Sequence, residues 1–325
     1  MKIVIFGGSG FVGAHLTGEL YKSGYDLIVC DLSAPPELTE KQVAFIQTDI
    51  RDKSHFSPIP LSEGDIVINL AANQYHQKVP RKGRKEYFFN TNTAGVGNIL
   101  EFMEKRGARH FIQFTTDMTY GRPRYLPIDT KHPQLPFGFY GQSKKAAEEI
   151  CFEYRRKGFH ITLFRPRMIM GPGRLGILQK LFKLIDMNLP VPMIGNGNNH
   201  YQMVSVFDCV SAIVAAINKG IPNQEFNLGS KNPPTIKKLL AGIIRESGSR
   251  SVLIPTWGRL VKTTLSLMGN MGFEIMYREQ FLIADEEYIL DISQTESFLD
   301  WRPVYGDADM IKEAYLAYKK NGAGH

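Results

Sequence analysis

The chain has 325 residues, of which 43% are hydrophobic and 22% are charged, values close to the averages of globular proteins. This composition excludes a disordered, collagen-like or coiled-coil chain, and the length predicts a main domain with a smaller second lobe. The 39 lysines and arginines exceed the 32 aspartates and glutamates by only seven. This modest excess fits anionic small ligands and does not indicate a nucleic-acid partner.

Short β-branched segments alternate with longer helical patterns in the first half of the chain. The predicted strands are residues 2–6, 27–31, 43–47, 66–70, 110–115 and 160–165, and the helices between them include 10–22, 84–106 and 139–157. Strands joined by helices form right-handed crossovers and a parallel sheet. We therefore predict a Rossmann-like, doubly wound α/β fold with a ligand crevice beyond the carboxyl ends of the strands.

The pattern changes after Arg165, where turns rich in proline and glycine such as 171–173 and 195–197 appear. A further helix at 208–218 and a strand at 225–228 are typical of the main sheet again. We therefore predict a discontinuous organisation. The Rossmann domain is formed by residues 1–167 and about 203–230, and a substrate-binding lobe by about 168–202 and 231–325.

The longest apolar run, residues 210–217, is shorter than the roughly 20 residues that a membrane-spanning helix needs. The apolar start, residues 1–6, leads directly into a glycine turn and is too short for a signal peptide. Cys30, Cys151 and Cys209 are odd in number and lack C-x-x-C spacing, so we expect reduced thiols and no metal site. These features predict a cytoplasmic protein.

Five cations lie close together at Lys78, Arg81, Lys82, Arg84 and Lys85. Surfaces that bind single-stranded nucleic acid usually carry aromatic residues between their cations, on which the bases stack. This run has no such aromatic residue. Two roles stay open for this run: a solvated loop that leads into a helix, and a lid that attracts an anionic substrate.

A glycine-rich segment follows the first predicted strand and opens the first predicted helix. It contains Gly7, Gly10 and Gly13, with Phe11 and Val12 at the helix start. Glycines at these positions allow a tight turn and the close approach of a pyrophosphate, which the helix N-terminus binds through its free N–H groups. The segment therefore predicts a dinucleotide-binding site.

Asp31 ends the second predicted strand, 18 residues after Gly13. A carboxylate at this position accepts hydrogen bonds from the adenosine ribose hydroxyls and repels the additional phosphate of NADP. Asp31 therefore predicts NAD as the cofactor, unless a cation such as Lys41 neutralises it.

Tyr140 and Lys144 lie on the same face at the start of the predicted helix 139–157, because they are four residues apart. A neighbouring ammonium group and an oxidised nicotinamide stabilise phenolate, which brings the pKa of a phenol from about 10 toward neutral pH. The segment Thr115-Thr116-Asp117 ends the preceding strand, where a hydroxyl can hydrogen-bond the same substrate oxygen. The arrangement indicates proton transfer at an alcohol or a ketone.

The order of these motifs resembles the extended short-chain dehydrogenase/reductase family, in its NAD-dependent epimerase/dehydratase branch. The motifs are the glycine loop, Asp31, the threonine strand end and the Tyr-x-x-x-Lys pair. The resemblance covers nearly the whole chain. It implies that Tyr140 is the catalytic acid or base, that Lys144 holds the nicotinamide ribose, and that Thr116 orients the reacting hydroxyl or carbonyl. It also implies cofactor contacts by Asp49, Ile50, Leu70, Ala71, Ala72, Asn92 and Thr115.

Departures from the family pattern bear on the reaction. Sugar 4,6-dehydratases carry Thr-Asp-Glu at the strand end, where the Glu abstracts a proton; here that position is Met118, which disfavours dehydration. Nucleotide-sugar enzymes often place Asn and Arg where this chain has Met168 and Tyr201. The predicted substrate contacts are Asp117, Met118, Arg167, Met168 and Tyr201, and the candidate phosphate ligands are Arg122, Arg124, Arg167 and Arg174.

We therefore predict an NAD-dependent oxidoreductase that interconverts a secondary alcohol and a ketone, on a nucleotide-linked sugar, as an epimerase or keto-sugar oxidoreductase. The resemblance also implies a homodimer that pairs through helices 84–106 and 139–157.

Two alternatives stay open. Residues 253–276 are rich in apolar side chains, and Met268, Met271 and Met276 either line a pocket for a hydroxysteroid- or lipid-type alcohol or merely pack the lobe. A non-catalytic NAD-binding protein is the remote alternative, because a binding module needs only the glycine loop.

Overall fold

The computed structural model describes residues 1–34, 43–75, 79–172, 178–270 and 276–322. Its centre is a seven-stranded sheet in the order β10-β6-β5-β4-β1-β2-β3, in which every neighbouring pair is parallel. The strands are β1 (Lys2–Phe6), β2 (Asp26–Asp31), β3 (Ala44–Gln47), β4 (Ile66–Asn69), β5 (His110–Phe114), β6 (His160–Pro166) and β10 (Glu225–Leu228). The predicted doubly wound α/β fold is therefore confirmed.

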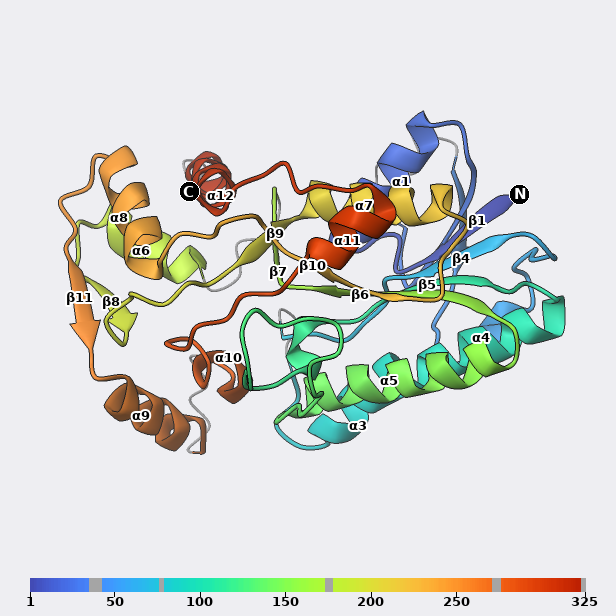
Figure 1. Cartoon of the computed structure of the whole chain (residues 1–325), viewed down its shortest axis with the longest axis horizontal. Helices are drawn as coiled ribbons and strands as arrows, with labels where there is room; N and C mark the ends of the chain where they lie inside the picture. Colours follow the sequence, from blue (N-terminus) through green and yellow to red (C-terminus); the bar gives the residue numbers. More distant parts are fainter. Residues whose placement is uncertain (35–42, 76–78, 173–177, 271–275, 323–325) are drawn as a thin grey trace.

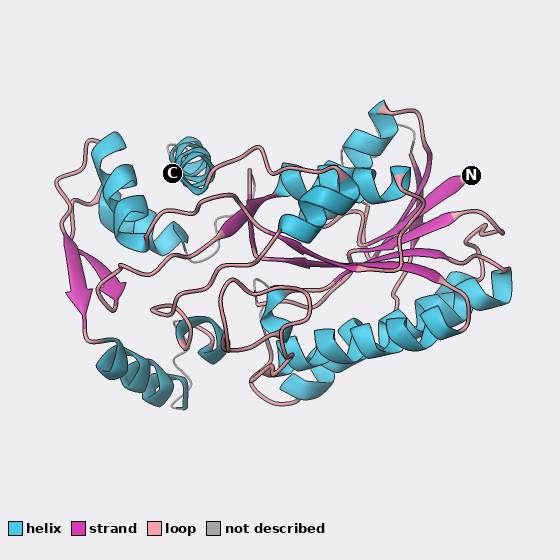
Figure 2. Ribbon diagram, viewed as in Figure 1, coloured by secondary structure: helices cyan, strands magenta, loops and turns pink. Residues whose placement is uncertain are grey.

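Helices cover both faces of this sheet (Figure 2). Alternate residues of β1 enter different cores: Ile3 and Ile5 belong to one buried cluster, and Val4 and Phe6 to the other. This alternation follows from the two-residue period of a strand, and it explains why the central strands read as continuous apolar runs. The covering helices are α1 (Phe11–Lys22), α7 (Val206–Asn218) and α11 (Ser293–Leu299) on one face, and α4 (Gly95–Arg106) and α5 (Phe139–Arg156) on the other.

The helix predicted at 84–106 contains a wide turn in its middle. It consists of α3 (Arg84–Phe89), a π-helical turn η2 (Asn90–Ala94) and α4. Directly after the wide turn, Gly95 lies against Ile50, whose Cδ1 would be 2.6 Å from a Cβ at this position. π-Helical turns inside α-helices frequently mark functional sites, and this one carries Asn92.

The second lobe lies beyond β7 (Met168–Met170) and β9 (Met203–Ser205), which pair with each other, on the left of Figure 1. There β8 (Val191–Ile194) pairs with β11 (Leu253–Thr256). A separate apolar core joins Phe182, Leu240 and Ile311. The lobe's helices are α6 (Leu178–Asp186), α8 (Ile236–Glu246), α9 (Gly258–Asn270), α10 (Arg278–Phe281) and α12 (Asp307–Gly322). The exact domain boundaries given above stay predictions.

No helix in the described ranges combines the length and the apolar content that crossing a membrane requires. Cys30, Cys151 and Cys209 are unpaired and buried.

Candidate active site

A cleft of about 1570 Å³ opens at the carboxyl ends of the central strands, and residues of both lobes line it. Every residue predicted for catalysis, cofactor contact or substrate contact, except Asn92, lines this cleft. The predicted cofactor residues there are Gly7, Gly10, Phe11, Val12, Gly13, Asp31, Asp49, Ile50, Leu70, Ala71, Ala72 and Thr115, the catalytic ones are Thr116, Tyr140 and Lys144, and the substrate ones are Asp117, Met118, Arg167, Met168 and Tyr201. The cleft thus brings together residues from positions 7 to 201.

The glycine loop between β1 and α1 has the shape that a pyrophosphate requires. Gly7 has a φ of +77°, and a Cβ there would lie 2.4 Å from the Ala71 nitrogen. A Cβ on Gly13 would lie 2.2 Å from the Gly7 carbonyl oxygen. Only glycine fits these positions. The loop leads into α1, whose N-cap, Gly10, has no capping side chain, so the helix end is left for an anion. The loop therefore fits a dinucleotide.

Asp31 is held beside this loop at the end of β2. Its Oδ2 accepts a hydrogen bond from the Ser9 N–H at 2.9 Å, and its Oδ1 accepts one from the Leu32 N–H at 2.8 Å. A carboxylate has about four acceptor positions, so both oxygens can also accept ribose hydroxyls. Lys41 lies outside the described residues.

Asp49 and Ile50 line the cleft after β3. Hydrogen bonds from Arg51 lower the pKa of the Asp49 carboxyl, with the Arg51 Nε 2.9 Å from Oδ1. Arg51 also lines the cleft. It is a cation on the cofactor side that no sequence motif indicates.

Asn92 lies behind the cleft wall, in η2, and its direct contact with a cofactor is not supported. Its buried amide accepts a hydrogen bond from the Asn73 N–H at 2.8 Å and donates to the Asn73 carbonyl and the Ser143 hydroxyl, both at 3.1 Å. These bonds occupy the side chain. Asn92 instead fixes Asn73, which does line the cleft, against α5.

Tyr140 stands in an aromatic wall and is only 6% exposed. The rings of Tyr75 and Phe88 approach it edge-on, with centroids 5.4 and 5.8 Å away, and Tyr277 of the second lobe stacks on Tyr75 at 4.4 Å. Tyr75 and Tyr277 also line the cleft. The wall excludes water around the Tyr140 ring, and no local sequence pattern indicated its two outer members.

Lys144 is fully buried one helical turn after Tyr140 in α5. Burial lowers the pKa of its ammonium to about 8, and the nearby Glu148 carboxylate acts in the opposite direction. The ammonium donates a hydrogen bond to the Phe114 carbonyl at 3.0 Å. At neutral pH most Lys144 side chains therefore carry the charge that supports a phenolate on the same helix face.

Glu148 and Arg165 form a buried ion pair behind the catalytic residues. The Glu148 carboxylate accepts hydrogen bonds from Arg165 Nη2 at 2.6 Å and from the Thr115 hydroxyl at 2.6 Å. Arg165 also donates to the Tyr120 hydroxyl at 3.0 Å. The pair connects α5 with the ends of β5 and β6, and no local sequence pattern predicts it.

Asp117 is bound by a second buried guanidinium. The Arg167 Nη1 donates to Asp117 Oδ2 at 2.6 Å, and the Thr116 hydroxyl donates to Asp117 Oδ1 at 3.1 Å. Arg167 lies between the rings of Tyr201 and Tyr288, each centroid 4.1 Å away. Both carboxylate oxygens of Asp117 are thus already engaged. Met118 at the following position disfavours dehydration.

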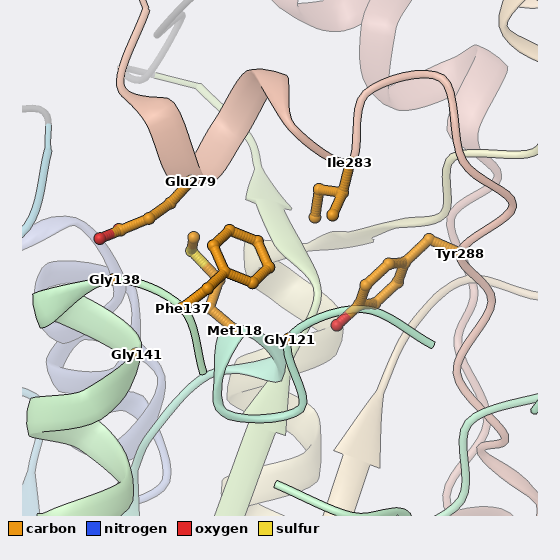
Figure 3. A pocket seen from close by; sticks show the side chains of 8 residues that line it. All are labelled: Met118, Gly121, Phe137, Gly138, Gly141, Glu279, Ile283 and Tyr288. Atoms are coloured by element: carbon orange, nitrogen blue, oxygen red, sulfur yellow. The ribbon is translucent and has the colours of Figure 1, made fainter. Parts of the chain in front are cut away.

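Met118 faces a glutamate from the second lobe. Figure 3 shows Glu279 projecting from α10 toward the start of α5, beside Met118. The Glu279 Oε1 would be 1.3 Å from a Cβ on Gly138, so the carboxyl occupies the space that this glycine leaves. It accepts a hydrogen bond from the Phe139 N–H. Its Oε2 is buried and has no hydrogen-bond partner among the described residues.

We expect Glu279 to make stability pH-dependent. Burial raises the pKa of its carboxyl to about 7, and the Phe139 N–H opposes this shift. Between its ordinary pKa of 4.5 and about 7, the folded protein holds a proton that the unfolded chain has lost. The free energy of unfolding therefore falls as the pH rises through this range.

Glu279→Gln keeps the acceptor for the Phe139 N–H and removes the charge. At pH 8 it is expected to raise the free energy of unfolding by about 1–3 kcal/mol. At pH 4 it should match the wild type, since both side chains are then neutral. Urea unfolding at the two pH values measures this difference, and an equal effect at both would contradict the assigned burial of the charge.

Among the remaining basic candidates, Arg122 and Arg124 do not line the cleft. Arg122 pairs with Glu286 at 3.0 Å, and Arg124 is exposed. Arg174 and Lys78 lie outside the described residues. None of the other cations in the run 78–85 lines the cleft, so the lid role gains no support. Lys180 on α6 does line the cleft, which makes it a further cation that the sequence analysis missed.

Comparisons with known proteins agree with this geometry. The NAD dependent epimerase/dehydratase family model matches residues 3–229. The uncharacterized protein y4nG of Sinorhizobium fredii is 30% identical over 98% of this chain and 79% of its own. A UDP-glucose 4-epimerase of Lactobacillus helveticus is 30% identical over 100% of this chain and 99% of its own.

The crystal structure of a UDP-glucuronic acid 4-epimerase from Bacillus cereus in complex with NAD has a TM-score of 0.76 to this chain, with 21% identity over 99% of both chains. This likeness shows a shared fold. The family model covers more than half of the chain, and the predicted family and its NAD cofactor are confirmed. The chain belongs to the NAD dependent epimerase/dehydratase family and is an NAD-dependent enzyme of the extended short-chain dehydrogenase/reductase type.

Proposed function

We propose that the enzyme epimerises a nucleotide-linked sugar by oxidising a secondary alcohol to a ketone and reducing the ketone from its other face. The observation that carries this proposal is the single cleft, in which the glycine loop and Asp31 lie together with Thr116, Tyr140 and Lys144. Its volume of about 1570 Å³ leaves room for a sugar nucleotide beside the cofactor. The Lactobacillus helveticus relative, a UDP-glucose 4-epimerase, supports the same substrate class.

The roles of the catalytic residues are part of this proposal. When bound, NAD supplies the chemistry of accepting and returning a hydride. Tyr140 takes the proton of the sugar hydroxyl and later gives it back, while the Lys144 ammonium stabilises the phenolate. The Thr116 hydroxyl, now bonded to Asp117, turns to the reacting oxygen. The aromatic wall around Tyr140 keeps water away from this proton transfer.

The cleft offers less support for an apolar alcohol. Of the three methionines proposed for such a pocket, Met276 lines the cleft, Met268 lies partly buried on α9 away from it, and Met271 lies outside the described residues. The apolar side chains of residues 253–267 are mostly on the surface. Among the described residues, these methionines therefore do not assemble one pocket.

Recycling of the cofactor distinguishes a nucleotide-sugar epimerase from a dehydrogenase that acts on an apolar alcohol. An epimerase must keep its reduced cofactor between the two half-reactions, so we expect gently purified protein to release NAD only on denaturation, as mass spectrometry can detect. Calorimetry should show UDP binding, and proton NMR should show interconversion of UDP-sugar epimers without added NAD. A protein that ignores UDP and consumes external NAD with an apolar secondary alcohol would be the alternative enzyme.

Asp31→Asn is expected to reduce the preference for NAD over NADP by about tenfold or more, because it removes a charge that repels the additional phosphate while keeping an acceptor for the Ser9 N–H. Calorimetric titration of both cofactors measures the preference. Gln47→Asn, at the exposed end of the neighbouring strand β3, is a control that should leave the ratio unchanged. Tighter binding of NADP by the wild type would contradict the role of Asp31.

We also propose that the enzyme is a cytoplasmic homodimer. Its three buried, unpaired cysteines are typical of a reducing compartment. The predicted subunit contact uses α3, α4 and α5, which lie side by side at the lower right of Figure 1. We expect light scattering to give twice the chain mass at micromolar concentration. A monomer mass would remove this contact.

A further inference from the structure

The outer face of α9 presents apolar side chains to solvent. Trp257, Leu260 and Leu267 are 83%, 62% and 57% exposed, and Thr264 between them is also exposed. Trp257 belongs to the same turn, because its carbonyl accepts a hydrogen bond from the Val261 N–H at 3.0 Å. Spacings of three, seven and ten residues from Trp257 fall on one side of a helix. We call these four residues the α9 surface.

The opposite side of α9 holds the helix on the second lobe. Val261, Leu265 and Met268 are partly buried. The Lys262 ammonium donates to the Leu282 carbonyl at 2.6 Å and pairs with Asp285. These contacts fix α9 to the segment that carries Glu279 and Ile283 in the cleft wall. The α9 surface is therefore presented outward on a helix tied to the active site.

The chain segment that carries the α9 surface is basic. Residues 247–273 contain no aspartate or glutamate. Arg250 and Arg259 are exposed, and neither has an ion-pair partner within the described parts of the chain. Two further apolar side chains, Val252 and Ile254, are exposed on the strand before α9. Figure 1 places β11 and α9 at the end of the second lobe that is farthest from the N-terminus.

The exposed apolar side chains and the arginines together favour a membrane surface as the binding partner. Tryptophan and leucine on one helix face with arginine beside them are typical of helices that lie in a membrane interface, where the rings enter the headgroup region and the cations meet anionic lipids. A second copy of the chain fits less well, because a two-fold contact would bring the exposed arginines of two copies together, and the nearby Asp285 is already paired with Lys262.

We propose that the α9 surface binds an anionic lipid bilayer and holds the active site at the membrane surface. The helix lies on the bilayer and does not cross it. Trp257, Leu260 and Leu267 enter the interface, and Arg250 and Arg259 bind lipid phosphates. The proposal is independent of which sugar the enzyme converts.

Tryptophan fluorescence tests this proposal directly, because the chain has two tryptophans and the other, Trp301, is 4% exposed. Phosphatidylcholine vesicles that contain phosphatidylglycerol should shift the emission of Trp257 to shorter wavelength and sediment the protein. Binding should weaken as salt is added. No shift and no sedimentation would overturn the proposal.

Leu260→Ser with Leu267→Ser keeps Trp257 and should weaken vesicle binding about tenfold or more. Arg250→Gln with Arg259→Gln should weaken binding to anionic vesicles and leave any weak binding to phosphatidylcholine alone unchanged. Val304→Ser is the matched control, because Val304 is 81% exposed outside this surface, and it should bind as the wild type does.

None of these residues lines the cleft, so turnover of a water-soluble substrate should stay unchanged and show that the variants are folded. Wild-type binding by the double leucine variant would overturn the proposal. Light scattering that shows loss of a dimer in the double leucine variant would also overturn the proposal, since the α9 surface would then be a subunit contact. A protein partner bound through α9 without any vesicle binding would overturn it as well.

Discussion

Tyr140→Phe is expected to lower turnover by roughly 10²–10⁴-fold, the contribution that a positioned proton-transfer group makes. The phenol oxygen carries the proton in the proposed reaction, and phenylalanine keeps the ring and its contacts with Tyr75 and Phe88. Because the ring stays, NAD binding and the folded structure should change little. Single-turnover assays with a UDP-sugar measure the loss.

Tyr75→Phe is the matched control for this variant. Tyr75 contacts the same ring and lines the same cleft, but its hydroxyl is buried without a hydrogen-bond partner in the described chain. Loss of that hydroxyl removes no bond, so turnover should stay within a few fold of the wild type. Near wild-type turnover by Tyr140→Phe would reject the assignment of Tyr140 as the acid or base.

The central sheet could be predicted well from the sequence. The predicted strand 2–6 and β1 have the same bounds, because a parallel strand buried on both faces is a short, continuous apolar run. The π-helical turn η2 could not be predicted in this way. Its Asn92 side chain bonds Asn73 and also Ser143, 51 residues away, and these contacts leave no trace in the local pattern.

The site residues also fall into those that the local sequence predicts and those that only long-range packing places. Residues at strand ends, such as Asp31 and Thr116, were predicted because parallel strands bring their carboxyl ends to one edge of the sheet. Glu279 and Tyr277 approach from the second lobe, and their place in the cleft follows from the packing of α10 against the start of α5. The family resemblance implies a cofactor contact for Asn92, but it could not tell that the Asn92 amide bonds Asn73 and Ser143 behind the cleft wall.

The buried pair of Glu148 and Arg165 is the other feature with a large expected effect. Glu148→Leu is expected to reduce the free energy of unfolding by about 3–5 kcal/mol, because it leaves the Arg165 charge buried without a partner. The two side chains are 0% and 3% exposed, so solvent cannot replace the lost carboxylate. Arg165→Met should reduce the free energy of unfolding by a similar amount, because it leaves the Glu148 carboxylate buried without its cation.

Two further variants isolate the charge effect in urea unfolding. Glu148→Leu combined with Arg165→Met should recover a large part of the loss, because no unpaired charge remains. Glu101→Leu removes a carboxylate on the surface that pairs with Lys105 at 2.7 Å and with Lys53 at 2.5 Å, and it should cost about 1 kcal/mol or less. A Glu148→Leu variant no less stable than Glu101→Leu would contradict the buried pair.

The same pair should also influence catalysis through Lys144. Burial already lowers the pKa of the Lys144 ammonium to about 8, and the Glu148 carboxylate limits this decrease. Glu148→Gln removes that negative charge, so Lys144 should lose its proton at a lower pH. If Lys144 supports the Tyr140 phenolate, the fall of activity at high pH should then begin at lower pH than in the wild type, whereas Glu101→Gln should leave the profile in place. A pH profile that is lower at every pH but not displaced would show that Glu148 acts only by holding α5 against β5 and β6.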